Sequence, residues 1–358
     1  MKLKLKNTPE QIELVKAMGS RDNAVAAEAN QAFAAFLGPV VAKVLLQAAT
    51  ASAIYTDLPY DEDDRPSIPL DLWYDGGEGY VTTWSQSVAG GLPTSTVEGF
   101  AEMKVATYRL DSAVSFLKRY ARRGRLDVVS KAVERMANEV LVKQERNAWA
   151  VALKTLAESG NVLNTDETTV TFTLDILNRL MTQVKRINRS YAGGTTTDAY
   201  GLTDLFVSPE VKEDIRSFAY QPVAITTTAN TLPTNNVLTN LPDGVREDIY
   251  RAAGTQEIYG VTIHDLIELG AGQKYNSLFK EFYSGTFTAA SDELIVGLDL
   301  TKDAFVRPVA RQAESGGTFT ALPDDQFVAR SEKIGFYGFL EEGRACVDSR
   351  AVHGVVIR

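Results

Sequence analysis

Few residues in this sequence are of the types that do chemistry. The chain has two histidines, His264 and His353, and one cysteine, Cys346. The histidines lie far apart among apolar residues of expected strands, so we expect packed or surface histidines rather than metal ligands. A single cysteine allows neither a standard zinc signature nor a disulfide within the chain, which is typical of a reducing compartment.

Carboxylates are plentiful, but their spacing is ordinary. Asp292–Glu293 and Glu341–Glu342 are adjacent pairs, and we expect solvated turn residues at both, the second pair within a hairpin. The run Asp61–Asp64 has oxygen ligands suited to a hard cation, but it lacks the alternation and the glycine of a calcium loop. A solvated linker over residues 56–69 is therefore the stronger interpretation.

The familiar catalytic and nucleotide-binding motifs are absent from the sequence. It has no HExxH, no Gly-Lys pair of a phosphate-binding loop and no GxSxG nucleophile elbow. The pair Gly77 and Gly79 lacks the third glycine of a dinucleotide site. The sequence thus predicts no catalytic residue, no cofactor site and no metal site. A function as an unidentified cytoplasmic α/β enzyme stays open as a weaker alternative to a non-catalytic role.

The charge of the chain limits its partners. The chain has 358 residues, enough for two or more domains, and a net charge of −9. Its one dense basic cluster comprises Arg119, Arg122, Arg123 and Arg125, at an expected strand-to-helix junction where solvated charge is the ordinary role. An acidic protein can surround DNA, but it is not expected to bind DNA tightly.

The N-terminal region is expected to be helical. Residues 9–50 are rich in alanine with few large side chains to bury, so they predict an arm rather than a compact domain. Pro39, Lys43 and Gln47 interrupt the most apolar stretch, and no run reaches the length of a membrane span. Gly19-Ser20 and Gly38-Pro39 interrupt this helical region, and we expect residues 32–53 to form a helical pair, broken at Gly38-Pro39, that buries against another surface.

A glycine-rich and aromatic segment follows. Residues 71–93 hold five glycines, with apolar residues on both sides of a Gly-Gly pair, which is typical of a β-hairpin or a long ribbon. Because a ribbon cannot bury large aromatics by itself, we predict that four of them contact another subunit: Trp73, Tyr74, Tyr80 and Trp84. The alternative is that these side chains pack on the chain's own sheet.

The clearest expected element is a helix over residues 126–159. Apolar residues recur at helical spacing, no glycine or proline interrupts them, and the helix is about 50 Å long at 1.5 Å per residue. A strand region is expected before it, over residues 100–119, with a break near Asp111-Ser112.

The rest of the chain is expected to be mixed α/β and then mainly strands. In the mixed region, Ser208 and Pro209 mark the N-cap and the first position of a helix. Two long loops, residues 190–203 and 221–244, are of a length that is usually functional or disordered. Strands follow in the last third of the chain.

This order of elements resembles that of tailed-bacteriophage major capsid proteins, which have the Hong Kong 97 fold. The resemblance implies an α+β fold with an N-terminal arm, an extended β-ribbon loop, a long spine helix in a peripheral domain, and a mixed α/β axial domain. The implied ranges are the arm at 1–55, the extended loop at 66–104, the peripheral domain at 105–164 and 300–358 with its spine helix at 126–159, and the axial domain at 165–299.

The resemblance also implies a function. The chain would assemble into hexamers and pentamers of an icosahedral head shell in the bacterial cytoplasm and be found in the virion. Its partners would be copies of itself and portal, scaffolding or cement proteins, with double-stranded DNA enclosed without sequence-specific binding and with no membrane contact. An alternative of the same fold is an encapsulin-like nanocompartment shell.

One family feature is not expected in this chain. The type member of the family cross-links its subunits through a lysine of the extended loop, which joins an asparagine of another subunit. Residues 66–103 contain no lysine and no arginine. We therefore expect no such isopeptide bond, so noncovalent contacts or cement proteins would have to hold the subunits together.

Overall fold

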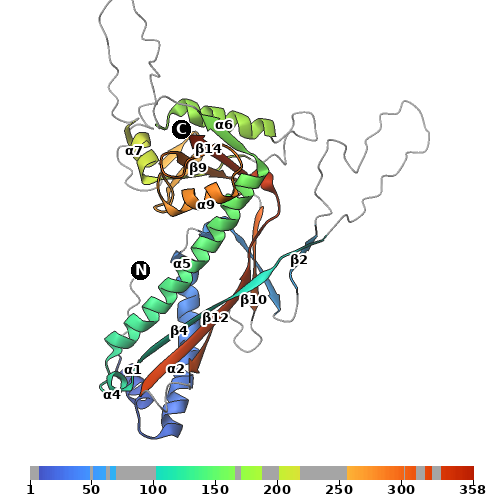
Figure 1. Cartoon of the computed structure of the whole chain (residues 1–358). Coiled ribbons are helices and arrows are strands. Elements are labelled where there is room, and N and C mark those ends of the chain that lie inside the picture. The colour runs from blue at the N-terminus through green and yellow to red at the C-terminus, as the bar shows by residue number, and fades with distance from the viewer. Residues whose placement is uncertain are drawn as a thin grey trace, which may run out of the picture. The chain divides into compact units, whose positions relative to one another are not determined.

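The computed structural model describes residues 8–48, 51–61, 65–69, 102–165, 171–187, 201–217, 256–301, 303–311, 319–324 and 332–358. The chain divides into two compact units, whose elements are labelled in Figure 1. Unit 1 comprises Met1–Ala148 and Phe305–Ala345, and unit 2 comprises Trp149–Ala304 and Cys346–Arg358. Each unit has its own sheet and its own hydrophobic core.

Unit 1 is built on a six-stranded sheet. Its strands are β1 (Thr56–Asp61), β4 (Thr107–Leu117), β10 (Phe305–Arg311), β11 (Thr320–Asp324), β12 (Lys333–Gly343) and β13 (Ala345–Cys346). Their order is β1-β10-β12-β11, with β4 paired to β12 and β13 to β10. β4 runs antiparallel to β12 along its whole length, from Leu117 opposite Lys333 to Thr107 opposite Gly343.

The N-terminal helices pack into the core of unit 1. The two that do so are α1 (Pro9–Met18) and α2 (Asn23–Ala48), and the short α3 (Ala51–Ile54) follows them in the chain. The ring of Phe33 on α2 lies 5.2 Å from that of Phe336 on β12, and Leu37 and Val41 belong to the same core. The region has few large side chains, but several of them are buried in the core of unit 1, and residues 32–53 do bury against another part of the chain.

The expected division of this region at Gly38-Pro39 is wrong. α2 is continuous from Asn23 to Ala48. A proline inside a helix costs about 3 kcal/mol, because it removes a hydrogen bond and its ring meets the preceding turn. Burial of three or four large side chains, at about 1.5–3 kcal/mol each, is sufficient to offset that cost.

The long helix is confirmed with its expected bounds. The short helix α4 (Lys118–Arg122) joins β4 to α5, which runs from Leu126 to Ser159. Gly160 follows with a φ of +70°, which suits the end of a helix. The expected break at Asp111-Ser112 is wrong, because β4 keeps an unbroken register with β12 through these residues.

The acidic region 56–69 is not simply a linker. Residues 56–61 form β1, which pairs in parallel with β10 from Thr56 opposite Val306 to Asp61 opposite Arg311. Asp57 lies 3.5 Å from the Arg307 guanidinium. The rest of the acidic run, residues 62–64, lies outside the described residues.

Unit 2 contains the second six-stranded sheet, in the order β5-β14-β9-β6-β8-β7. The core of this unit lies between the sheet and the apolar face of α6, which includes Ile176, Leu177 and Leu180. β9 and β14 are buried along their whole length, in keeping with sequences that are mainly apolar apart from Glu293 and His353. The elements are β5 (Val162–Thr165), α6 (Leu174–Ile187), β6 (Asp204–Val207), α7 (Pro209–Ser217), β7 (Gln256–Ile258), β8 (Val261–Asp265), α9 (Lys274–Phe282), β9 (Glu293–Leu298), a 3₁₀ turn (Ser349–Ala351) and β14 (Val352–Ile357).

A buried carboxylate joins several elements of unit 1. Glu341 and Glu342 continue β12 and are not part of a hairpin, and the Glu342 side chain is fully buried. Tyr108 of β4 and Gln144 of α5 donate to its carboxylate at 2.9 and 3.0 Å. Arg344 lies 3.3 Å from the carboxylate, and Arg307 of β10 lies 3.0 Å away as an ion pair without hydrogen-bond geometry.

Replacement of Glu342 tests this network. Glu342→Ala leaves Arg344 buried without its counter-charge and Arg307 with only the half-exposed Asp57, so we expect the free energy of unfolding to fall by about 3–5 kcal/mol. The measurement is urea denaturation followed by circular dichroism. Glu158→Ala is the control, because this exposed carboxylate pairs with Lys154 at 3.6 Å and contributes about 0.5 kcal/mol or less. Equal losses in the two variants would contradict a central role for Glu342.

Candidate functional site

The four aromatics predicted to contact another subunit lie outside the described residues. Trp73, Tyr74, Tyr80 and Trp84 fall between residues 70 and 101. The structure does show where this segment leaves and returns. β2 (Ser67–Pro69) pairs antiparallel with β3 (Glu102–Lys104) as a separate two-stranded sheet, with Pro69 opposite Glu102 (Figure 1).

An aromatic and charged patch lies on the face of the unit 1 sheet that carries Tyr337 and Phe339. The guanidinium of Arg109 lies 3.8 Å from the ring centroid of Phe339 and 2.8 Å from Asp111. The Tyr337 hydroxyl donates to Asp111, which raises the pKa of Tyr337 and lowers that of Asp111. Leu322, exposed on β11, lies opposite Tyr337. Stacked arginine and aromatic side chains of this kind are typical of protein interfaces.

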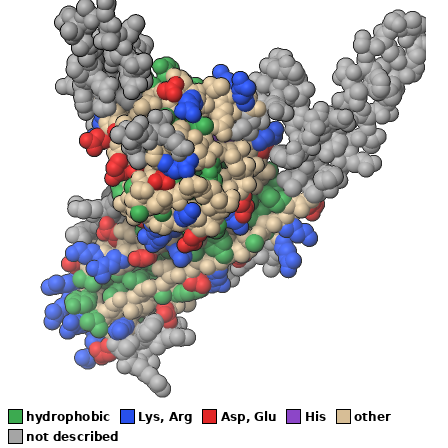
Figure 2. Space-filling model, turned by 45° about the horizontal axis from the view of Figure 1, so that its top comes forward, with side chains coloured by type: hydrophobic (Ala, Val, Ile, Leu, Met, Phe, Trp, Pro, Cys, Tyr) green, Lys and Arg blue, Asp and Glu red, His purple; other side chains and the backbone are tan. Residues whose placement is uncertain are grey.

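The arginine cluster lies at the strand-to-helix junction where the sequence placed it. Arg119, Arg122, Arg123 and Arg125 are all exposed, in and just after α4. Arg122 Nε donates to the carbonyl oxygen of Gly19 at 2.9 Å, which holds the junction against the end of α1. Figure 2 shows several Lys and Arg side chains close together at the lower left of the view. A cluster like this can bind carboxylates or phosphates.

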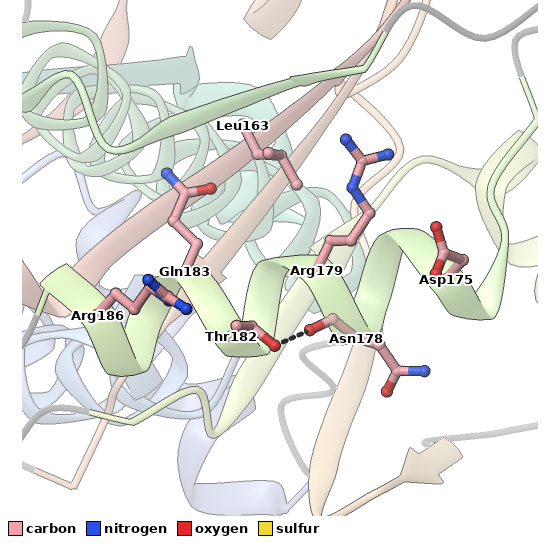
Figure 3. A pocket seen from close by; sticks show the side chains of 7 residues that line it. All are labelled: Leu163, Asp175, Asn178, Arg179, Thr182, Gln183 and Arg186. Carbon is pink, nitrogen blue, oxygen red and sulfur yellow. Dashed lines mark hydrogen bonds between the residues drawn. The ribbon is translucent and has the colours of Figure 1, made fainter.

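An open groove of about 790 Å³ lies beside α6 in unit 2 (Figure 3). Arg179 and Gln183 extend from the helix on the side of Leu163, which comes from β5. Thr182 donates to the Asn178 carbonyl oxygen at 2.8 Å. Among the lining residues that the structure describes, no nucleophile is paired with a base, so these residues form no catalytic arrangement. Its lining residues are Leu163, Asp175, Asn178, Arg179, Thr182, Gln183 and Arg186.

Asp292 and Glu293 are buried, as Glu342 is, whereas the sequence predicted solvated turn residues. Asp292 and Glu293 lie at the start of β9 with 6% of each exposed. Glu293 accepts hydrogen bonds from the Ser208 hydroxyl at 2.9 Å and from the Ala271 backbone N–H at 3.1 Å, and burial raises its pKa. Ser208 in turn accepts from Val211 N–H at 3.2 Å as the predicted N-cap of α7. The pair therefore positions a helix and a loop.

The two histidines are packed side chains, as expected. His353 on β14 is fully buried, and this burial lowers its pKa to about 4. His264 on β8 stacks on Phe206 and lies 2.7 Å from Asp204. The structure does not bring them together. Over the described ranges, no three His, Cys, Asp or Glu side chains form a group suited to a metal ion.

The described part of the chain gives two further results, on membrane-spanning helices and on the single cysteine. No helix there combines the length and the apolar character needed to cross a membrane. Cys346 is partly buried, and this burial raises the pKa of its thiol to about 12, which disfavours the thiolate.

Comparison with known proteins relates this fold to phage structures. One solved structure, from Microbacterium phage Oxtober96, shares 13% identity over 86% of this chain and 90% of its own, with a TM-score of 0.50. The acidic stable capsid of Helicobacter pylori bacteriophage KHP30 shares 10% identity over 87% and 91%, and the capsid of Cyanophage P-SCSP1u shares 10% over 87% and 88%, both with TM-scores of 0.50.

Comparison of sequences alone finds no similarity to phage capsid proteins or to any other family. No protein-family model matches the chain, and no curated protein matches it. The similarity to phage capsid structures is therefore a similarity of fold, and it extends over most of the chain. The mixed helix-and-sheet architecture expected from the order of elements, the Hong Kong 97-like capsid fold, is confirmed at this level.

The buried His353 predicts a pH dependence of stability. Its folded pKa of about 4 lies below its ordinary value of 6.5, so the unfolded chain binds this proton first as the pH falls. The stabilisation by neutral His353 is complete above pH 6.5 and is lost as the pH falls toward 4. Between pH 7 and 4.5 the loss is about 2–3 kcal/mol.

His353→Asn tests this pH dependence. We expect the variant to show a smaller difference in the free energy of unfolding between pH 7 and 4.5, measured by urea titration at each pH. A destabilisation that is independent of pH cancels in this difference. A variant that keeps the full wild-type difference would assign the acid sensitivity to other groups.

Proposed function

We propose that this chain is the major capsid protein of a tailed bacteriophage. Copies of it would assemble into hexamers and pentamers that close into an icosahedral head around double-stranded DNA. The observation that carries the proposal is the fold, which follows phage capsid structures over 87% of the chain. A shell protein acts through its surfaces, and the described surface carries an aromatic patch and an arginine cluster suited to contacts.

We propose the following roles for the parts of the chain. Residues 66–104 would be the extended loop, and the β2–β3 pairing at its two ends supports a two-stranded ribbon. Helix α5 would be the spine helix of the peripheral domain, and residues 1–55 the N-terminal arm. Residues 165–299 would be the axial domain, and we add the C-terminal strand β14 to it because β14 pairs with β5 and β9 in unit 2.

The proposed role is structural rather than catalytic. The buried carboxylates and histidines have packing roles: Glu342 joins β4, β10, β12 and α5, and Glu293 positions the start of α7. The net charge of −9 suits a container whose DNA must remain mobile during filling and release. We place assembly in the bacterial cytoplasm, with portal, scaffolding or cement proteins as further partners.

Electron microscopy of the purified chain tests the proposal. We expect closed polyhedral shells, or rings of five and six subunits, after size-exclusion chromatography. Shells filled with DNA in infected cells would distinguish a phage head from an encapsulin-like compartment, which would enclose a cargo protein instead. A uniform monomer or dimer at all salt and protein concentrations would contradict the proposal.

The three tryptophans of the chain allow a matched test of the extended loop. Trp73→Ala with Trp84→Ala should weaken assembly at least about 10-fold, since aromatic anchors dominate interfaces, and should leave the melting temperature of the unassembled subunit unchanged. Trp149→Ala should instead destabilise the subunit by about 3–5 kcal/mol, because Trp149 is fully buried 4.9 Å from Phe206. Equal destabilisation in both variants would show that Trp73 and Trp84 pack within their own chain.

A further inference from the structure

Charge is segregated along this chain. Residues 56–103 hold ten acidic residues and one arginine, so their net charge of −9 equals that of the whole chain. Residues 104–125 hold seven basic residues and one acidic residue. A strongly acidic segment is therefore followed directly by a strongly basic one.

The basic segment ends in the exposed arginine cluster. The turn that carries Arg123 and Arg125 is fixed by its backbone: Gly124 N–H donates to Ala121 O at 2.8 Å and Arg125 N–H to Tyr120 O at 3.1 Å. Gly124 has a φ of +62°, which favours glycine. Within the described part of the chain, none of the four guanidinium groups of the cluster forms an ion pair.

The acidic segment and the arginine cluster lie next to opposite ends of β4. β3 leads into β4 after two residues, and the arginine cluster begins where β4 ends (Figure 1). At about 3.3 Å per residue, Glu102 lies about 50 Å from the cluster. Residues 70–101 must leave Pro69 and return to Glu102, so a fold back onto their own cluster would require every residue of the segment to be fully extended.

We propose that the arginine cluster of one subunit binds the acidic and aromatic segment 70–101 of a second copy. This inference rests on the proposed assembly function and names a contact within it. The segment carries Asp71, Asp75, Glu78 and Glu98, with no lysine or arginine. Arginine suits such a partner because its planar guanidinium pairs with carboxylates and stacks on Trp and Tyr rings. The contact is head-to-tail, as a ring of identical subunits requires.

DNA phosphate is the other anion that the cluster could bind. The acidic segment is favoured because each copy of the chain brings one cluster and one segment, so the two are present in equal numbers in any assembly. The net charge of −9 also disfavours close approach of the chain as a whole to DNA. Binding of DNA at the cluster is kept as an outcome of the test.

A charge-reversal series tests the proposal in the full-length chain. Arg123→Glu with Arg125→Glu avoids Arg122, which holds α1, and should weaken self-association at least about 10-fold in analytical ultracentrifugation. Addition of Asp71→Arg and Asp75→Arg to this variant should restore association, because both sides of the contact are then reversed. Lys274→Glu with Lys280→Glu on α9 makes the same charge change at exposed positions of unit 2 and should associate as wild type.

The outcomes separate this proposal from the proposed function. Normal shells from the Arg123→Glu, Arg125→Glu variant would overturn the contact and leave the capsid proposal intact. Normal shells that enclose less DNA would overturn it in favour of phosphate binding. A wild-type chain that does not associate at all would overturn both proposals. Circular dichroism and thermal melting of each variant confirm that a loss of association is not a loss of fold.

Discussion

The sheet of unit 1 depends on one buried carboxylate. Glu342 lies at the point where β12 meets β10, β4 and helix α5, and each of these elements sends a polar side chain to it. A buried charge is expensive unless it is paired, so an arrangement that moved any of these elements away would leave the Glu342 carboxylate short of partners. The same environment, first through burial and then through the Glu342 charge, raises the pKa of Tyr108 to about 12.

This constraint also determines the outer surface of the sheet. Alternate residues of a strand face opposite sides, so a register in which Glu342, Leu340 and Phe336 face the core directs Tyr337 and Phe339 outward. β4 follows the same register, which places Arg109 against Phe339. A slip of one residue would bury the aromatic patch and expose the carboxylate network. The interior and the proposed contact surface are thus specified by the same pairing.

Much of the fold could be predicted from the sequence because its signals are local. The bounds of α5, the N-cap at Ser208 and the apolar face of α6 follow from spacing and capping chemistry. The features that could not be predicted from the sequence depend on contacts between residues that are far apart in the chain. The partner of β1 lies some 250 residues away in β10, and the burial of Glu293 and Glu342 is visible only once the strand register is known. Pro39 predicted a helix break because the core that stabilises α2 is not local.

A surface that contacts another subunit is harder to recognise in a sequence than a catalytic site. A catalytic site needs a few side chain types at fixed geometry, and such patterns leave motifs. A subunit contact needs complementary surfaces, which many sequences can provide, and this agrees with a shared fold at 10–13% identity. The signals that remain are the aromatic residues of a glycine-rich segment and the separation of acidic from basic charge along the chain. Both are properties of segments, so they point to surfaces rather than to individual residues.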